Sequence, residues 1–170
     1  MKFFQAVWSN QKMSKINLIY GSGDVLHTHV NINPFADEED GKTIIRGDIK
    51  NLDKYCDDCE LSELIATDVI DYVPHSENKK TLENWIKKIR IGGKIVIGGI
   101  DMFEVCKSVS LYEIDTFDAN ILLHGDQTKP YIIRKSNFTA VGLSEYLESK
   151  GLKIIKKRIK NYRMIVEGER

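Results

Sequence analysis

The chain has 170 residues, a length that suits one domain, and its 42% hydrophobic and 29% charged residues are typical of folded globular proteins rather than disordered chains. Its 25 basic and 25 acidic residues cancel, which disfavours a nucleic-acid partner, and its apolar runs fall far short of the roughly 20 residues of a membrane-spanning helix. The first residues lack the apolar core of a signal peptide, and three cysteines cannot all pair within the chain. We therefore expect a cytoplasmic protein outside the membrane, with a single domain over residues 1–170 and an extension or lid over residues 1–14.

Short apolar runs in the first part of the chain predict four strands. Each run stops at a turn that contains glycine, asparagine or other polar residues, and an acidic loop over residues 37–41 separates the second strand from the third. The strands are expected over residues 15–20, 29–32, 42–46 and 61–67.

The middle of the chain predicts a helix between two parallel strands. Apolar side chains recur at i, i+3, i+4 and i+7, which places them on one face of a helix that the glycines at positions 92 and 93 should end. Residues 94–100 predict a fifth strand, and Asp101 begins a further helix. The apolar face consists of Leu82, Trp85, Ile86 and Ile89.

The end of the chain predicts one more helix and a hairpin. Thr139 is a suitable N-cap and Gly151 a suitable end for a helix that contains Leu143 and Leu147. Strands over residues 152–159 and 163–167 are separated by three residues, a link that permits only an antiparallel pair. The predicted fold class is α/β, with a mostly parallel sheet and an antiparallel C-terminal hairpin.

Ligands of open parallel sheets bind beyond the carboxyl ends of the strands. The loops expected at that edge are rich in glycines, amides and carboxylates, which suit a polar small molecule with an amine, a ribose and a base. These loops comprise residues 21–24, 33–35, 47–51, 67–75 and 98–104.

The turn Gly21-Ser22-Gly23 lets the backbone approach a ligand without an intervening Cβ atom. No Gly-Lys-Ser/Thr sequence follows, so the turn is not a Walker loop, and it lacks the third glycine of a dinucleotide fingerprint. By itself the turn is also consistent with a purely structural role. Its position directly after the first strand favours a cofactor.

From residue 15 onward the chain resembles small class I methyltransferases of the methyltransferase-11-like group. The resemblance implies a Rossmann-like S-adenosylmethionine (SAM) methyltransferase fold, S-adenosyl-L-methionine as cofactor, and a small-molecule or sugar-derived methyl acceptor. It is carried by residues 16–24, 30–34, 47–52, 63–73, 85–97, 125–127 and 135–139. The cofactor-binding residues that it implies are Gly21, Ser22, Gly23, Asn33, Asp48, Ile49, Thr67 and Asp68.

Three positions depart from that family's pattern. Ile19 stands where an acidic residue usually precedes the glycine turn, and Asn33 replaces the ribose-binding carboxylate, a stronger acceptor than an amide. Tyr72 stands where many relatives have a histidine. A catalytically inactive binding or assembly module with the same fold therefore remains open, as does a nucleotide-binding module similar to short dehydrogenases.

Methyl transfer requires mainly that the acceptor be aligned, although a general base helps an oxygen or nitrogen acceptor. The candidates for that base are Asp68, Tyr72, His75 and His124, each of which is also consistent with a solvated loop residue. The sequence leaves the choice among them open, and it also leaves open whether the protein forms a homo-oligomer.

Two other features carry weaker signals. Cys56 and Cys59 have the spacing of half a zinc site, but no second pair follows, so we expect no metal. A basic cluster near the predicted hairpin is suited either to contact a phosphate or to protect an exposed edge strand. The cluster consists of Lys153, Lys156, Lys157, Arg158 and Lys160.

Overall fold

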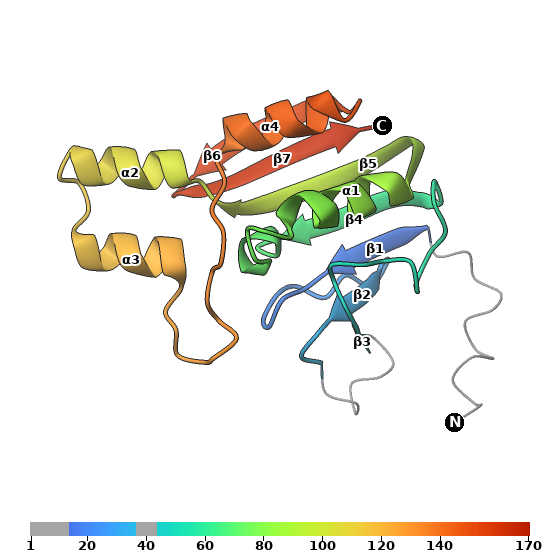
Figure 1. The fold of residues 1–170 in the computed structure, drawn as a ribbon, viewed down its shortest axis with the longest axis horizontal. Coiled ribbons are helices and arrows are strands. Elements are labelled where there is room, and N and C mark those ends of the chain that lie inside the picture. The colour runs from blue at the N-terminus through green and yellow to red at the C-terminus, as the bar shows by residue number, and fades with distance from the viewer. Residues whose placement is uncertain (1–13, 37–43) are drawn as a thin grey trace.

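A seven-stranded sheet in the order β3-β2-β1-β4-β5-β7-β6 forms the centre of the computed structural model, which describes residues 14–36 and 44–170 (Figure 1). Strands β1 to β5 run parallel to one another, whereas β7 is antiparallel to both β5 and β6. This confirms the predicted fold class. The strands are β1 (Lys15–Leu18), β2 (Val30–Asn33), β3 (Ile44–Arg46), β4 (Leu61–Thr67), β5 (Ile89–Ile100), β6 (Lys153–Lys160) and β7 (Arg163–Glu169). The expected extension or lid before Ser14 and the acidic loop over residues 37–41 lie outside the described residues.

One face of the sheet carries the main core. Ile16, Leu64 and Ile95 are in register on β1, β4 and β5, and all three are fully buried. Helices α1 (Asn78–Lys88) and α4 (Ala140–Ser149) lie in front of this sheet in Figure 1 and contribute side chains to the same core. Burial of these apolar side chains is the main source of stability in the fold.

The opposite face of the same strands is more polar, although Ile65 and Val96 also lie on it. Lys15, Glu63 and Lys94 are in register on β1, β4 and β5, and Lys15 and Glu63 form an ion pair at 3.2 Å. Parallel strands are usually apolar on both faces because helices cover both. Here the connection between β1 and β2, residues 19–29, contains no helix. The alternation of apolar and polar residues therefore matches a sheet with helices packed on one face.

The expected end of the first crossover helix was wrong. Helix α1 ends at Lys88, Ile89 is the first residue of β5, and both Gly92 and Gly93 lie inside that strand. The guanidinium group of Arg170 donates hydrogen bonds to the carbonyl groups of Ile86, Lys87 and Ile89 at the end of the helix. The backbone of Arg170 also pairs with Gly92 and Gly93, so the glycines extend the sheet instead of ending the helix.

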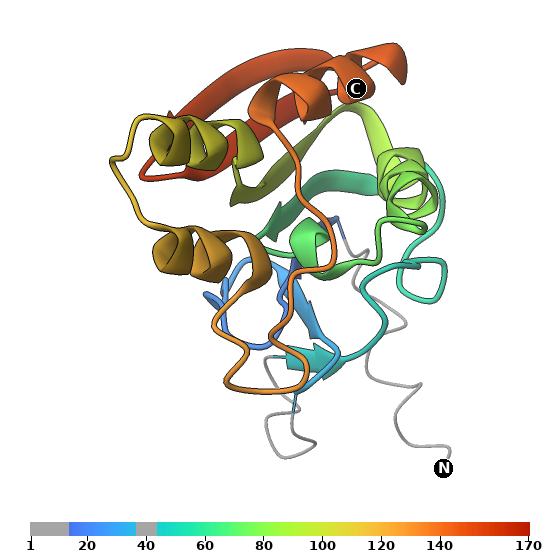
Figure 2. The ribbon, with the colours of Figure 1, turned by 60° about the vertical axis from the view of Figure 1, so that its left-hand side comes forward.

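Helices α2 (Met102–Ser110) and α3 (Thr116–His124) form a pair that projects beyond the carboxyl ends of the strands (Figures 1 and 2). The sequence predicted a helix after Asp101 but gave no prediction for α3. The buried carboxylate of Asp101 accepts hydrogen bonds from the backbone N–H groups of Glu104 and Ala140, at 3.0 and 2.7 Å. One side chain therefore caps the first turns of both α2 and α4.

Candidate functional site

The turns that follow the first three strands are joined by hydrogen bonds at one edge of the sheet. The side-chain amide of Asn33, the last residue of β2, donates to the carbonyl group of Gly21, after β1, at 2.9 Å. The backbone N–H of Gly47, after β3, donates to the carbonyl group of Asn33 at 3.3 Å. Because these strands are parallel, their carboxyl ends meet at this edge, where the sequence predicted a ligand site.

Four aromatic rings gather at this edge. Tyr20 follows β1, Phe35 follows β2, and Tyr72 ends the short helix η2 (Ile70–Tyr72) after β4. The rings of Tyr20 and Tyr72 stack with centroids 4.5 Å apart, and the ring of Phe35 meets Tyr20 edge-on at 4.9 Å. Tyr131, from the loop between α3 and α4, stacks on Phe35 at 4.3 Å. We refer to Tyr20, Phe35, Tyr72 and Tyr131 as the aromatic cluster.

The loop that carries Tyr131 is held at its two ends. The backbone N–H of Arg134 donates to the carbonyl group of His124 at 3.1 Å, which closes residues 125–133 into a compact loop. The N–H groups of Lys135 and Ser136 both donate to the carbonyl group of Asp71, which fixes the next residues onto η2. The side chain of Tyr131 reaches Gly21, where a Cβ atom in place of the glycine hydrogen would lie 3.5 Å from its ring. Tyr131 therefore lies against Gly21, whereas Ser22 and Gly23 of the same turn are exposed.

The expected cofactor residues near this cluster differ in what they can offer a ligand. Gly21 has a φ of 73°, a conformation that favours glycine, and its carbonyl group is already bonded to Asn33. The side chain of Asn33 is buried and also accepts a hydrogen bond from the N–H of Phe35. Asp48 is exposed and accepts a hydrogen bond from the N–H of Lys50. Ile49 is buried in the main core, away from solvent.

The remaining expected cofactor residues line separate hollows. Ser22, Gly23 and Thr67 line a hollow of about 150 Å³ together with Asn17 and Ile65, whose side chains lie on the polar face of the sheet. Thr67 and Asp68 line a second hollow of about 70 Å³ next to Arg163. The structure thus brings Gly21 and Asn33 to the aromatic cluster and places Ser22, Gly23 and Thr67 beside the other hollows.

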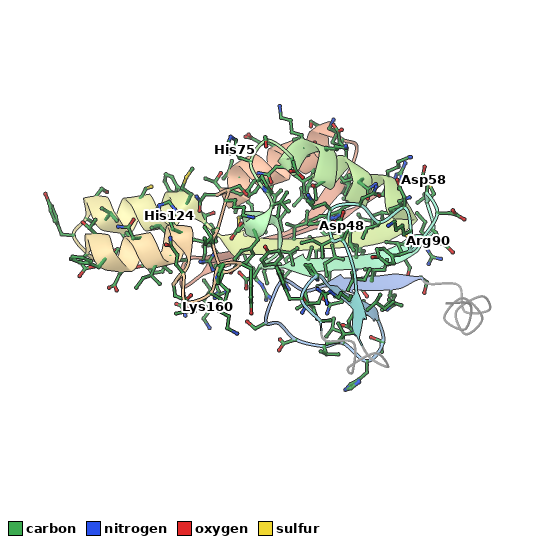
Figure 3. All side chains as sticks on the ribbon, turned by 60° about the horizontal axis from the view of Figure 1, so that its bottom comes forward. Asp48, Asp58, His75, Arg90, His124 and Lys160 are labelled. Atoms are coloured by element: carbon green, nitrogen blue, oxygen red, sulfur yellow. The ribbon has the colours of Figure 1, made fainter. Side chains whose placement is uncertain are left out.

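Two of the four candidate bases lie near the aromatic cluster, and two are exposed elsewhere. Asp68 has a left-handed φ of 54° and forms an ion pair with Arg163. Burial raises the pKa of the Tyr72 hydroxyl group, although the guanidinium group of Arg134, 5.6 Å from the ring centroid, opposes the shift. His75 and His124 are exposed, His75 between η2 and α1 and His124 at the end of α3 (Figure 3).

Sequence reasoning missed a buried ion pair beneath Tyr72. Asp71 is completely buried, its Oδ2 atom accepts the N–H of Ile100 at 2.9 Å, and Arg134 Nε lies 3.6 Å away. Burial raises the pKa of the Asp71 carboxyl group to about 7. A Cβ atom on Gly99 would lie 2.6 Å from Asp71 Oδ1, so only glycine leaves room for the carboxylate. The glycine pair inside an apolar strand was the available signal for this close approach.

The cysteines occupy different environments. Cys56 is buried, and burial raises its pKa to about 11, which makes it a poor thiolate ligand, whereas Cys59 is exposed. Within residues 14–36 and 44–170, no cluster of three or more histidine, cysteine or acidic side chains could hold a metal ion. In that same part of the chain, no helix has the length and apolar character needed to cross a membrane.

Comparisons with known proteins identify the fold. One similar structure is the 1,6-didemethyltoxoflavin-N1-methyltransferase of Burkholderia thailandensis, solved with 1,6-didemethyltoxoflavin and S-adenosylhomocysteine bound. It matches with a TM-score of 0.60 and 9% identity, over 91% of this chain and 70% of that one. A SAM-dependent methyltransferase from Archaeoglobus fulgidus matches with a TM-score of 0.60 and 12% identity, over 94% of this chain and 87% of that one.

A third structure, an O-methyltransferase family protein from Burkholderia thailandensis, matches with a TM-score of 0.56 and 10% identity, over 92% of this chain and 51% of that one. The chain thus spans about half of that protein. No protein-family model matches the sequence, and no curated protein matches it. At these identities the likeness shows that the chain has the fold of SAM-dependent methyltransferases.

Proposed function

We propose that the protein is a SAM-dependent methyltransferase that acts on a small-molecule or sugar-derived acceptor. One observation supports the proposal most directly. Hydrogen bonds join the turns at Gly21, Asn33 and Gly47 at one edge of the sheet. Open α/β sheets bind their ligands at this edge. The Burkholderia thailandensis structure with bound S-adenosylhomocysteine shares this fold.

The residues at this edge fit an adenosyl cofactor once Tyr131 has moved. In the proposed site, Gly21 offers unobstructed backbone, Asp48 offers an exposed carboxylate to a ribose, and the aromatic cluster offers flat apolar surfaces to a base. The cofactor, when bound, supplies an activated methyl group. Asn33 acts as a positioning residue, because both ends of its amide are engaged in holding the turns after β1 and β2.

Tyr72 is the candidate base most directly placed in the aromatic cluster, and its raised pKa defines what it can do. A hydroxyl group with a pKa above 10 keeps its proton at neutral pH. In the proposed enzyme Tyr72 therefore donates a hydrogen bond to the acceptor. Asp68, the first residue after β4, stays the candidate for accepting a proton.

A non-catalytic binding module is the second candidate function. It is favoured by Tyr131, which covers Gly21, and by the engagement of the Asn33 amide at the position where the methyltransferases that the sequence resembles have a ribose-binding carboxylate. Both observations reduce what the site can offer a cofactor. Such a module would retain the fold and bind a ligand without transferring a methyl group.

Calorimetric titration with S-adenosylmethionine and S-adenosylhomocysteine tests the proposal. A methyltransferase should bind both compounds at one saturable site, and a reduced dinucleotide in a parallel titration should not bind. Binding followed by methyl transfer to none of a panel of hydroxylated and aminated acceptors would favour the non-catalytic module. The absence of binding to either compound at millimolar concentration would overturn the proposed function.

A further inference from the structure

The α2–α3 helix pair presents large apolar side chains to solvent. Its inner side packs against a small core formed by Ile100, Val105 and Ala119. On the other side of α3, Phe117 and Ile121, at positions i and i+4, are 80% and 53% exposed. Phe103, in the first turn of α2 next to the sheet, is 61% exposed. Apolar residues thus surround α3, a distribution typical of helices that are covered on more than one side.

The turn between these helices adds to the same surface. Leu111 is exposed, and Tyr112 is 95% exposed with a left-handed φ of 58°. A non-glycine residue in this conformation is strained, and such strain concentrates at functional positions. Clustered exposed apolar residues rimmed by polar ones mark interaction sites. We refer to Leu111, Tyr112, Phe117 and Ile121 as the apolar tip.

Charges around the apolar tip are mostly acidic, and an opposite surface exists on the same chain. The helix pair carries Glu104, Glu113, Asp115 and Asp118 against the single Lys107. Strand β6, at the edge of the sheet, carries no acidic residue, and its exposed side chains include the apolar Ile155 and Ile159. Its basic residues are Lys153, Lys156, Lys157, Arg158 and Lys160. The net charge of the chain is zero, but the acidic helix pair and the basic strand β6 form two surfaces of opposite charge.

The two surfaces border each other. A hollow of about 380 Å³ separates them, lined by Glu104 and Ser108 of α2 and by Ile159 and Lys160 of β6. Lys160 is labelled next to the base of the helix pair in Figure 3. Because the acidic and basic surfaces are neighbours, a twofold axis between two copies can pair each with its complement at the same time.

We propose that the apolar tip binds a second copy of this chain. In this dimer the acidic helix pair of each protomer lies against the basic β6 strand of its partner, and the exposed aromatic rings form the buried centre of the contact. Aromatic anchors supply most of the energy of protein interfaces, while charges at the rim direct association and make it sensitive to salt. The contact also protects the exposed edge of β6 from unregulated strand pairing.

Sedimentation velocity over a concentration series, at low and high salt, tests the dimer. The wild type should reach twice the monomer mass at low salt and dissociate as salt is added. The double variant Tyr112→Ser/Phe117→Ser should weaken the dimer by about tenfold or more. Ile91→Ser removes an equally exposed apolar side chain from β5 and should leave the dimer intact.

Charge reversal identifies the two surfaces. Two double variants reverse the charge of one surface each: Lys157→Glu/Lys160→Glu on β6 and Glu104→Lys/Asp118→Lys on the helix pair. Each variant alone should be monomeric, and an equimolar mixture of the two should form a heterodimer. A folding defect could not restore the dimer in the mixture. A wild type that stays monomeric at every concentration would overturn the proposal. Sedimentation of the monomer with anionic phospholipid vesicles would also overturn it, because the apolar tip would then contact lipid. So would a dimer whose stability none of these variants changes.

Discussion

The buried carboxyl group of Asp71 lies under the candidate site, and its neighbours come from distant parts of the chain. Ile100 donates its N–H to the carboxylate, Gly99 leaves room for it, and Arg134 supplies the nearest positive charge. The sequence shows each of these residues but not their proximity, because spacing along one element says nothing about contacts between elements. Asp71 therefore could not be distinguished from an exposed loop residue until the fold was known.

We predict that Asp71 makes stability fall as pH rises. Its folded pKa is about 7, above its ordinary value of 3.8, so between pH 4 and pH 7 the folded state holds a proton that the unfolded state has lost. The unfolding free energy then decreases with pH across this window, by at most about 1.4 kcal/mol per pH unit, and is level above it. Asp71→Asn cannot ionise and can still accept the N–H of Ile100.

Urea unfolding of both proteins across this pH range measures the effect. The stability of Asp71→Asn relative to the wild type should rise steadily from pH 4 to pH 7. Two pH profiles that stay parallel would show that the carboxyl group ionises as readily in the folded protein as in the unfolded chain.

Tyr131 is expected to oppose cofactor binding. Its ring must leave Phe35 and Gly21 before a ligand can reach the glycine turn, and an aromatic stack contributes about 0.5–1.5 kcal/mol. Tyr131→Ala should therefore tighten the binding of S-adenosylhomocysteine by about two- to tenfold, as measured by calorimetry. Ile133→Ala, on the same loop, should leave the affinity unchanged. Weaker binding by Tyr131→Ala would mean that the ring contacts the ligand instead of blocking it.

At the scale of elements, most strands and the last helix could be predicted from local patterns. Thr139 caps α4 as expected, through its side-chain oxygen and the N–H of Gly142, because capping depends only on neighbouring residues. The end of α1 could not be predicted, because Arg170 reaches it from the far end of the chain. Helix α3 gave no signal, because Phe117 and Ile121 interrupt the single apolar face by which a helix is recognised.

Asp101 joins two elements, and its loss should affect both. Asp101→Ala leaves the N–H groups of Glu104 and Ala140 without their cap, one of them buried. We expect a loss of about 2–4 kcal/mol in unfolding free energy, measured by urea denaturation. Asp115→Ala removes only the exposed cap of α3 and should cost about 1 kcal/mol. Equal losses in the two variants would contradict the double role of Asp101.

At the scale of the whole molecule, the sequence predicted a mostly parallel sheet with its loops at one edge, and the structure has that arrangement. The polar face of the sheet was not predicted, although Lys15, Ile16 and Asn17 alternate along β1. The aromatic cluster could not be predicted, because Tyr131 lies in a loop without a periodic pattern, and its position depends on the closure of residues 125–133. The accessibility of the candidate site is therefore a property of the assembled fold.

A crystal structure of the protein with S-adenosylhomocysteine tests the central claim, that the turns after β1, β2 and β3 form a cofactor site closed by Tyr131. We expect electron density for the ligand beside Gly21, Asn33 and Asp48, with the Tyr131 ring displaced from Gly21. Crystals grown with saturating ligand in which Tyr131 still covers Gly21, and in which this edge of the sheet holds no ligand, would contradict it.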